Sequence, residues 1–392
     1  MKLPDLTLGI EEEFQVVDAE TRELKSHISQ MFEKGEAALH EKIQREFHQG
    51  VIEIGSKICR DIREARPDGT QTPATRSAIA REHGLRIASA GTHPFTHWAD
   101  VETTPNPRYD RILKDLQVVA RANLIFGLHV HVGLDDKETL IHVFNMARYF
   151  VPHILAFSVN SPFWCGRETG WKSYRTKVFE KFPRTGIPDA FTSFGEYEEL
   201  LRDLIRTNSI ENGKMIWWDL RPHWRYPTLE FRCCDAMMRV DETIAMGGPT
   251  QALLANAYLL HKRNLSFRLH RRALIQENKW RAARWGVEGR LIDLGKMQEV
   301  PLPHLAAELL DFVDEVVDEL GVRSEIGYLR EIVAGGTGAD RQLAVWRQTG
   351  DFKKVMDYIV SETEHGLPLG DSREGFRPGD DADGAGAVGP PG

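Results

Sequence analysis

Leu8-Gly9-Ile10-Glu11-Glu12-Glu13-Phe14 predicts a β-strand whose two faces differ in character. Because side chains alternate along a strand, Glu11 and Glu13 project together from one face. Two neighbouring carboxylates repel each other, so they suit a site where divalent cations offset their charge. The same segment also fits an edge strand whose acidic face lies in water, and by itself it does not separate the two interpretations.

Three later segments repeat this alternation between an apolar face and a chemically capable one. Residues 51–55, 128–133 and 228–235 each place hydrophobic side chains at every second position, as half-buried strands do. One layout explains all four segments: a sheet with helices against one face and a cavity on the other. The cavity-facing residues of these later segments are Glu53, then His129 and His131, then Glu230 and Arg232.

Such a mixture of side chains favours Mg²⁺ or Mn²⁺ over zinc, because oxygen ligands dominate and no thiolate is suitably placed. Several divalent ions among carboxylates indicate polyphosphate binding. Arg232 would then aim its guanidinium at a phosphoryl group in transfer. Taken singly, each feature has a simpler explanation: His-x-His occurs in structural positions, and Glu-x-Arg is most often a surface ion pair. Their joint appearance on four strands favours a site.

Elsewhere the spacing of apolar residues is mainly helical. The stretch 160–189 is rich in Gly, Pro, Ser and Trp and predicts a long loop, and loops of that length usually carry function. After residue 366 the chain has few large apolar residues, which predicts a disordered tail over 366–392 behind one domain at 1–365. Helices are predicted at 28–47, 70–88, 109–123, 137–149 and 154–159, and from 241 onward the signal is mainly helical.

Composition restricts the class of protein. Hydrophobic residues make up 41% of the 392 residues, enough for a core, and 50 Lys and Arg against 58 Asp and Glu give a net charge of -8. No basic stripe indicates a nucleic-acid partner, and neither a signal core nor a membrane span is evident. We therefore expect a cytosolic protein. Its four cysteines lack paired spacing and should be reduced; they are Cys59, Cys165, Cys233 and Cys234.

Two common nucleotide-binding motifs do not occur. The glycine cluster at 335–338 lacks the lysine and the strand-to-helix context of a phosphate-binding loop. No Gly-x-Gly-x-x-Gly follows a strand, so a dinucleotide fold is not indicated.

Five segments, in this order along the chain, carry a resemblance to a known family: 9–14, 91–95, 129–133, 160–164 and 228–232. They read GIEEEF, GTHPF, HVHVG, NSPFW and TLEFR, and the chain resembles the type 2 glutamate-cysteine ligases, or ATP-dependent carboxylate-amine ligases, from about residue 6 to about residue 360. The resemblance implies a glutamine synthetase and guanidino kinase-like α+β fold. In such a fold a curved, mostly antiparallel sheet has the active site on its concave face and helices behind.

The resemblance also implies roles for particular residues. Arg232 would contact phosphate and, with Arg221 and Glu53, belong to the catalytic set. His131, Thr92 and Arg221 would line the nucleotide or phosphate region. Segment 160–175 would either recognise the amino acid or brace the loop. The implied metal ligands are Glu11, Glu13, Glu53, His129 and Glu230, and the candidates for amino-acid recognition are Asn160, Ser161, Trp164, Ser173, Tyr174 and Arg175.

The implied reaction is ATP-driven amide formation. The γ-carboxylate of glutamate would attack the γ-phosphate of ATP, and the amine of cysteine would displace phosphate from the resulting acyl phosphate, with Mg²⁺ or Mn²⁺ as cofactor. Family members sharing these motifs can serve other carboxylates and amines, so the substrate pair stays open. A homodimer or larger homo-oligomer would be in keeping with the family.

Two other classes of function compete with this one. A metal-dependent amidohydrolase also uses His-x-His on a strand, although it would want further histidines and an aspartate on successive barrel strands. A nucleotide-binding homologue without turnover would keep the fold, but it has no reason to retain carboxylates that repel one another.

Overall fold

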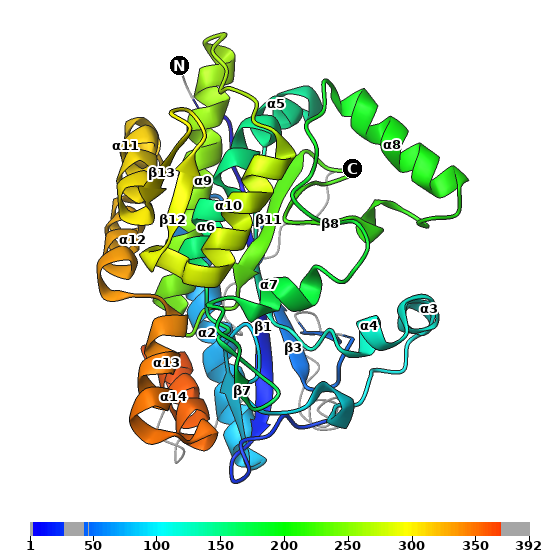
Figure 1. The fold of residues 1–392 in the computed structure, drawn as a ribbon, viewed down its shortest axis with the longest axis vertical. Helices are drawn as coiled ribbons and strands as arrows, with labels where there is room; N and C mark the ends of the chain where they lie inside the picture. The colour runs from blue at the N-terminus through cyan, green and yellow to red at the C-terminus, as the bar shows by residue number, and fades with distance from the viewer. Residues whose placement is uncertain (1–2, 27–42, 46, 370–392) are drawn as a thin grey trace, which may run out of the picture.

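The structure is a computed structural model that describes residues 3–26, 43–45 and 47–369 (Figure 1). The helix predicted at 28–47 lies almost wholly outside the described residues, and so does the predicted tail apart from 366–369. Residues 43–45, which were predicted as helix, form a short strand instead.

A seven-stranded sheet runs through the centre of the protein (Figure 1). Its order is β10-β11-β5-β1-β3-β2, β4 pairs with the second half of β1, and all of these pairings are antiparallel. The predicted α+β class with a mostly antiparallel sheet is confirmed, and the sheet is not the strand barrel of an amidohydrolase. The strands are β1 (Leu8–Asp18), β2 (Ile43–Arg45), β3 (Val51–Gly55), β4 (Leu85–Ala88), β5 (Gly127–Gly133), β10 (Leu220–Pro222) and β11 (Thr228–Asp235).

Helices cover one face of this sheet. Leu128, Val130 and Val132 of β5 are fully buried in the largest apolar core, which they share with residues of the covering helices. Figure 1 shows these helices stacked beside β11 and β1. The helices are α2 (Ile62–Glu82), α3 (Pro107–Leu116), α4 (Val118–Arg121), α5 (Lys137–Ala147), α6 (Val151–Ser158), α7 (Tyr174–Phe179), α8 (Phe194–Arg206), α9 (Val240–Lys262), α10 (Arg272–Trp285), α11 (Leu302–Leu320), α12 (Arg323–Gly335), α13 (Gly338–Thr349) and α14 (Phe352–Glu364).

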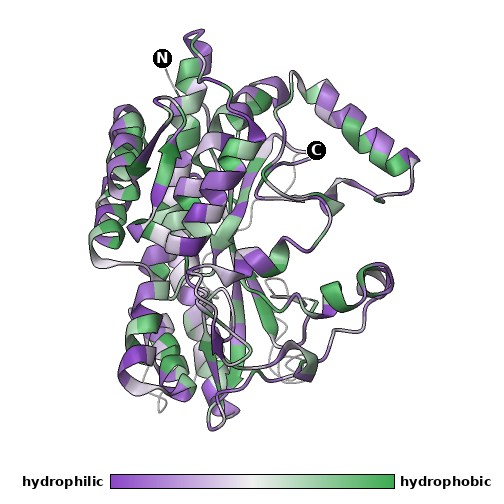
Figure 2. Ribbon diagram, in the orientation of Figure 1, coloured by the Kyte–Doolittle hydropathy of each residue, from purple (hydrophilic) through white to green (hydrophobic). Residues whose placement is uncertain are grey.

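Local sequence explains where several helices begin and end. The Asp61 side chain accepts hydrogen bonds from the first backbone N–H groups of α2, and Ser193 caps α8 in the same way. Gly321 ends α11 with a φ of 69°, a left-handed conformation that suits glycine. Hydrophobic and hydrophilic residues alternate along α8 and α11 in Figure 2, as expected for helices with one face in water.

Three further predicted elements differ from the structure. The predicted helix 70–88 is wrong at both ends, because α2 already begins at Ile62 and stops at Glu82, after which Gly84 (φ 71°) leads into β4. The predicted helix 109–123 is broken, because Gln117 has a φ of 49°. The predicted loop 160–189 contains α7 and three two-residue strands. The short strands outside the sheet pair as β6 (Phe163–Trp164) with β7 (Arg167–Glu168), β8 (Thr185–Gly186) with β9 (Trp217–Trp218), and β12 (Arg290–Asp293) with β13 (Gln298–Pro301).

Glu12 lies on the helix-covered face of β1, opposite to its two acidic neighbours, as the alternation predicts. It is 7% exposed, and its carboxylate accepts hydrogen bonds from the hydroxyls of Ser89 (3.2 Å) and Thr243 (3.0 Å). Burial raises the pKa of Glu12 to about 7, and the hydroxyls oppose this only in part.

All four cysteines are free thiols, which confirms the expected absence of disulfides among them. Cys233 and Cys234 are both buried, because a register shift of β11 between Phe231 and Cys234 interrupts the alternation predicted for residues 228–235. One described segment, Lys137–Ser158, has the length and hydropathy of a membrane span. Because 83% of its most apolar 18-residue window is buried inside the protein, it has the character of a core helix pair.

Candidate active site

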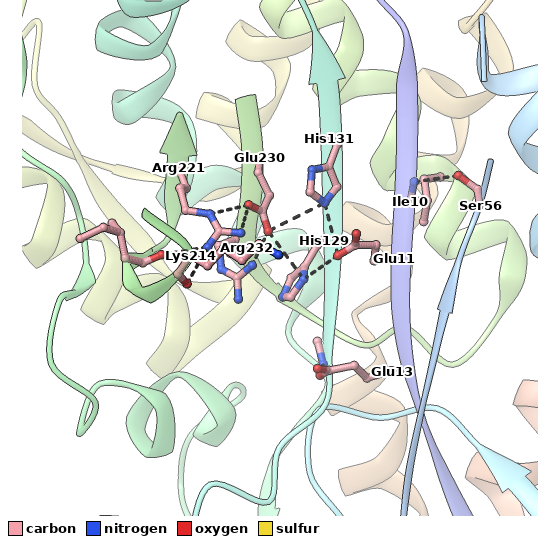
Figure 3. A network of polar contacts seen from close by, with 12 residues as sticks. Ile10, Glu11, Glu13, Ser56, His129, His131, Lys214, Arg221, Glu230 and Arg232 are labelled. Atoms are coloured by element: carbon pink, nitrogen blue, oxygen red, sulfur yellow. Dashed lines mark hydrogen bonds and ion pairs between the residues drawn. The ribbon is translucent and has the colours of Figure 1, made fainter. Parts of the chain in front are cut away.

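Three neighbouring strands bring predicted site residues together on the uncovered face of the sheet (Figure 3). In the antiparallel register Glu11 of β1 lies opposite His129 of β5, and Glu230 of β11 lies opposite His131. On its other side His131 faces Gly9, which has no side chain to crowd the imidazole. The alternation of these strands therefore produces one compact cluster of two carboxylates and two imidazoles.

Both imidazoles lie between the two carboxylates. The Oε2 atom of Glu11 is 3.4 Å from His131 Nε2 and 3.6 Å from His129 Nδ1, and Glu230 Oε1 is 3.8 and 3.9 Å from the same two atoms. Burial would raise the pKa of Glu11, but hydrogen bonds with the imidazoles outweigh it and hold that pKa well below its usual range. Burial lowers the pKa of His129 to about 4, whereas at His131 Glu230 and Glu11 outweigh burial and raise the pKa.

Glu230 is held between two arginines. Its side chain is 1% exposed, its Oε2 atom is 2.6 Å from Arg221 Nε, and its Oε1 atom pairs with Arg232 Nη1. Burial would raise the pKa of Glu230, but Arg232 and Arg221 outweigh it and keep the group ionised. Such buried charges depend on one another, because removing one member of an ion pair leaves the opposite charge of its partner uncompensated. The cluster thus fixes two guanidinium groups beside the imidazoles.

Glu11, both histidines and both arginines of this cluster line a cavity of about 370 Å³, a volume typical of small-molecule sites. A second hollow of about 220 Å³ shares Glu11 and His131 with it. The larger cavity combines acidic groups, imidazoles, four cations and several aromatic rings. Its titratable lining residues are Glu11, Glu13, Glu53, His48, His129, His131, His223, Arg175, Lys214, Arg221 and Arg232, and the rings are Phe47, Tyr109, Phe179, Phe182, Trp217 and Trp224.

Glu13 and Glu53 form a second carboxylate pair on the same cavity wall. They lie directly opposite each other in the register of β1 and β3, which places such side chains in contact range. The Glu13 carboxylate also accepts a hydrogen bond of 2.6 Å from the backbone N–H of Gly127. The structure therefore brings all five predicted metal ligands to one face, in two groups along β1.

Arg175 lines the cavity, but most of the other residues predicted to recognise the amino acid lie behind it. Asn160, Ser161 and Ser173 are completely buried, and all three donate hydrogen bonds to the Asp235 carboxylate. They brace the loop, which is the second of the two roles that the sequence left open for this segment.

Thr92, Trp164 and Tyr174 also lie away from the cavity lining. Thr92 is 1% exposed and donates a hydrogen bond of 2.7 Å to the carbonyl oxygen of Phe163. It therefore ties two segments together instead of bordering the region where we predicted a nucleotide. The rings of Trp164 and Tyr174 pack against each other with centroids 5.8 Å apart.

Several lining residues were missed in the sequence. Lys214 lies on a short 3-10 helix, η3 (Gly213–Met215), and Trp217 lies on β9. Neither belongs to a periodic pattern, and only tertiary folding brings them to the cavity. The density of tryptophan around 217–224 was the one available signal. Asp235 was missed as well, although it directly ends the strand that carries Glu230.

One group of described residues has the spacing of a metal site: Glu11, His131 and Glu230. Each offers one ligand atom, and these three atoms all lie within 4.8 Å of one another. Two carboxylates and one imidazole suit Mg²⁺ or Mn²⁺. The histidine of this group is His131, which we had predicted to line the nucleotide or phosphate region. His129, the predicted metal ligand, is not part of the group.

Comparison with known proteins agrees on one family. The model of the glutamate-cysteine ligase family 2 matches residues 7–358. A relative from Solibacter usitatus is 54% identical over 365 residues, which cover 93% of this chain and 95% of that protein. A relative from Roseiflexus castenholzii is 52% identical over 363 residues, with 93% and 96% covered. Both carry the name glutamate–cysteine ligase 2 as a provisional assignment.

Two solved structures share the fold. The glutamate–cysteine ligase of Francisella tularensis, solved in complex with AMP, superposes with a TM-score of 0.66 at 14% identity over 94% of this chain and 90% of its own. A bifunctional glutathione synthetase from Pasteurella multocida gives a TM-score of 0.67 at 14% identity over 92% and 52%. At such low identity the likeness shows a common fold and does not assign roles to residues.

Proposed function

The chain belongs to the glutamate-cysteine ligase family 2, and from this premise we propose that it is an ATP-dependent ligase that joins glutamate to the amine of cysteine. In this reaction a γ-carboxylate oxygen attacks the γ-phosphorus of ATP, and ADP leaves. The cysteine nitrogen then attacks the acyl carbon of the acyl phosphate. The amine loses a proton, phosphate leaves with the electrons of the broken C–O bond, and γ-glutamylcysteine is formed.

One observation carries the proposal: a single cavity combines the carboxylate–imidazole cluster with four cationic side chains. Phosphoryl transfer depends on positive groups placed where negative charge moves, and on ligands for the ions that accompany ATP. A hydrolase working on neutral amides would have little use for four cations around one small cavity. The combination therefore supports ATP chemistry in particular.

Arg232 and Arg221 are the residues that we propose to stabilise the transferring phosphoryl group. Both line the cavity, and Glu230 fixes both guanidinium groups through the ion pairs described above. Because Glu230 already orients them, they need not reorganise when charge develops on the phosphoryl oxygens. The aromatic rings around Trp217 and Phe179 offer flat apolar surfaces for the adenine.

We propose Glu11, Glu13, Glu53, His129, His131 and Glu230 as the set from which metal ligands are drawn. The spacing of Glu11, His131 and Glu230 supports this, and so does the ionised state of both glutamates. Mg²⁺ or Mn²⁺ bound there would neutralise the charge of the polyphosphate. The two hollows that meet at Glu11 and His131 would let the nucleotide and the amino acid reach these residues from different sides.

The test is phosphate release from Mg-ATP in the presence of glutamate and a panel of amines that includes cysteine. The proposal predicts release that requires both the carboxylate and the amine. Release with other pairs but not with glutamate and cysteine would keep the ligase and change its substrates. Hydrolysis of an amide without ATP would favour the amidohydrolase, and nucleotide binding without any amine-dependent release would indicate a binding protein without turnover.

We further propose that the enzyme works in the cytoplasm, as a homodimer or larger homo-oligomer, with residues 1–365 as its catalytic domain. The family membership is compatible with this proposal. Sedimentation velocity of the full chain and of a chain ending at residue 365 tests it, and a monomer in both cases would contradict the oligomer.

A further inference from the structure

The guanidinium group of Arg175 lines the cavity and lies 5.8 Å from the Phe179 ring, and its charge acts on the buried Asp235 carboxylate, but it makes few hydrogen bonds of its own. The residue is 3% exposed, and Nη1 and Nη2 each lie 3.4 Å from the carbonyl oxygen of Arg232, at the long limit of a hydrogen bond. Its Nε atom is buried and has no hydrogen-bond partner in the described part of the chain. A guanidinium has five N–H donors, and leaving buried donors unsatisfied is costly. The group is therefore suited to bind an anion in the cavity.

Gly127, the first residue of β5, leaves the space that this guanidinium occupies. A Cβ atom at position 127 would lie 2.3 Å from Arg175 Nη2 and 3.0 Å from its Cζ. The backbone does not demand glycine here, because Gly127 is not among the glycines with positive φ. Its N–H donates to Glu13, a bond that alanine could also make. Glycine at this position thus serves the side chain of Arg175.

Asp235 fixes the backbone from which Arg175 extends. Its Oδ2 atom accepts hydrogen bonds from the backbone N–H of Asn160 (2.8 Å) and the hydroxyl of Ser161 (2.7 Å), and its Oδ1 atom accepts one from Ser173 (2.8 Å). The Ser161 hydroxyl in turn accepts a bond of 3.0 Å from the backbone N–H of Arg175. A buried chain of three groups therefore leads from the end of β11 to this residue.

We propose that Arg175 binds an oxyanion of a substrate, and that Gly127 and Asp235 are positioning residues that hold its guanidinium on the cavity wall. This rests on the proposed function only for the identity of the ligand, which is either a phosphate of the nucleotide or a carboxylate of the amino acid. The shared chemistry is a planar guanidinium that meets two oxygens of an anion. Neither Gly127 nor Asp235 touches the ligand in this proposal.

The test compares wild-type protein with Arg175→Ala, Gly127→Ala and the double variant. Binding of Mg-bound, non-hydrolysable ATP, of glutamate and of inorganic phosphate is measured by calorimetry. We expect Arg175→Ala to weaken one of these ligands about 10- to 100-fold, the range of a lost charged hydrogen bond. Gly127→Ala should weaken the same ligand, and the double variant should be no worse than Arg175→Ala. Loss for the nucleotide and phosphate identifies a phosphate site, whereas loss for glutamate identifies a carboxylate site.

Two further variants separate positioning from general damage. Ser161→Ala removes the link between Asp235 and the backbone of Arg175, and it should weaken the same ligand in the wild type but not in Arg175→Ala. Gly195→Ala, on α8 with its nearest contact at 3.6 Å, is the matched glycine control and should leave all affinities unchanged. A merely structural role would lower the melting temperature without this selectivity for one ligand.

The outcomes for the proposal and for the enzymatic function are separate. Affinities that Arg175→Ala and Gly127→Ala leave unchanged overturn the proposal even if the protein releases phosphate in an amine-dependent way. A wild-type protein that binds none of the three anions overturns it as well. Selective loss of one anion in these variants, with no amine-dependent phosphate release by the wild type, would support the oxyanion site and refute the ligase.

Discussion

Replacing Glu12 by glutamine should stabilise the protein above pH 7 and leave turnover intact. The carboxyl group is buried against the covering helices, where the hydroxyls of Ser89 and Thr243 and a backbone group of Met237 form hydrogen bonds with it. Burial raises its pKa from 4.5 to about 7, and the nearby Glu242 carboxylate adds to the shift. The folded protein therefore holds a proton on Glu12 at a pH where the unfolded chain has released it.

The size and sign of the effect follow from this difference. A shift from 4.5 to about 7 corresponds to about 3 kcal/mol, at about 1.4 kcal/mol for each pH unit. Between these two pH values the unfolded chain binds fewer protons than the folded protein, so the free energy of unfolding falls as pH rises and levels off above pH 7. Glutamine at position 12 cannot ionise, and the variant should lack this fall.

Urea unfolding followed by circular dichroism, at about pH 5 and about pH 8.5, measures the difference. We compare the free energy of unfolding of Glu12→Gln with that of the wild type. The difference should be about 2–3 kcal/mol larger at the higher pH than at the lower one. Glu331→Gln, an exposed change on α12, is the control and should show no such pH dependence. An increase in the free energy of unfolding that is equal at both pH values, or a decrease at pH 8.5, would refute the reasoning. Loss of phosphate release would refute the placement of Glu12 away from the site.

The remaining predictions concern its neighbours and two buried groups elsewhere. Glu11→Gln and Glu13→Gln should each abolish phosphate release while circular dichroism shows a retained fold, and loss of folding with metal affinity retained would contradict their proposed role as ligands. His93 accepts a backbone N–H bond on its buried ring, and burial lowers its pKa from 6.5 to about 4. The neutral, buried imidazole therefore stabilises the fold above pH 6.5. Up to about 3 kcal/mol of this stabilisation is lost as pH falls through 4. In urea unfolding, the free energy of unfolding of His93→Asn should fall less than that of the wild type as pH decreases from 6.5 to 4. An equal fall would show that His93 does not titrate as described. Lys279→Met should cost about 3–5 kcal/mol in urea unfolding by leaving the buried Asp219 carboxylate uncompensated. Asp219→Asn should recover part of that cost in the double variant, and no recovery would show that the ion pair is not the cause.

The strand pattern predicted the polar face of the sheet because a strand has a period of two residues. Glu11, His131 and Glu230 could be assigned to one face from the sequence, since each alternates with apolar neighbours that the core must bury. The order of the strands was not predictable from that pattern. The cluster arises because β5 lies between β1 and β11, although β5 follows β1 by more than a hundred residues.

The loop residues illustrate why the rest of the site was not predictable. Ser161 and Ser173 were candidates for substrate recognition or for bracing the loop, because they stand in a polar segment that resembles the family, and the sequence did not separate the two roles. Their hydroxyls satisfy the buried carboxylate of Asp235, which is the bracing role, and this requirement exists only in the folded protein. In the same way, nothing in the local sequence marks Lys214 as a lining residue, or Gly127 as the space for a guanidinium.

Transfer of isotopically labelled oxygen from glutamate to phosphate tests the ligase reaction itself. Wild-type protein is supplied with Mg-ATP, cysteine and glutamate that carries heavy oxygen in its γ-carboxylate, and the released phosphate is analysed by mass spectrometry. Activation of the carboxylate through an acyl phosphate predicts one labelled oxygen in each phosphate released, together with γ-glutamylcysteine in equal amount. Phosphate without label, or label transfer without an amide product, would contradict the reaction that we propose.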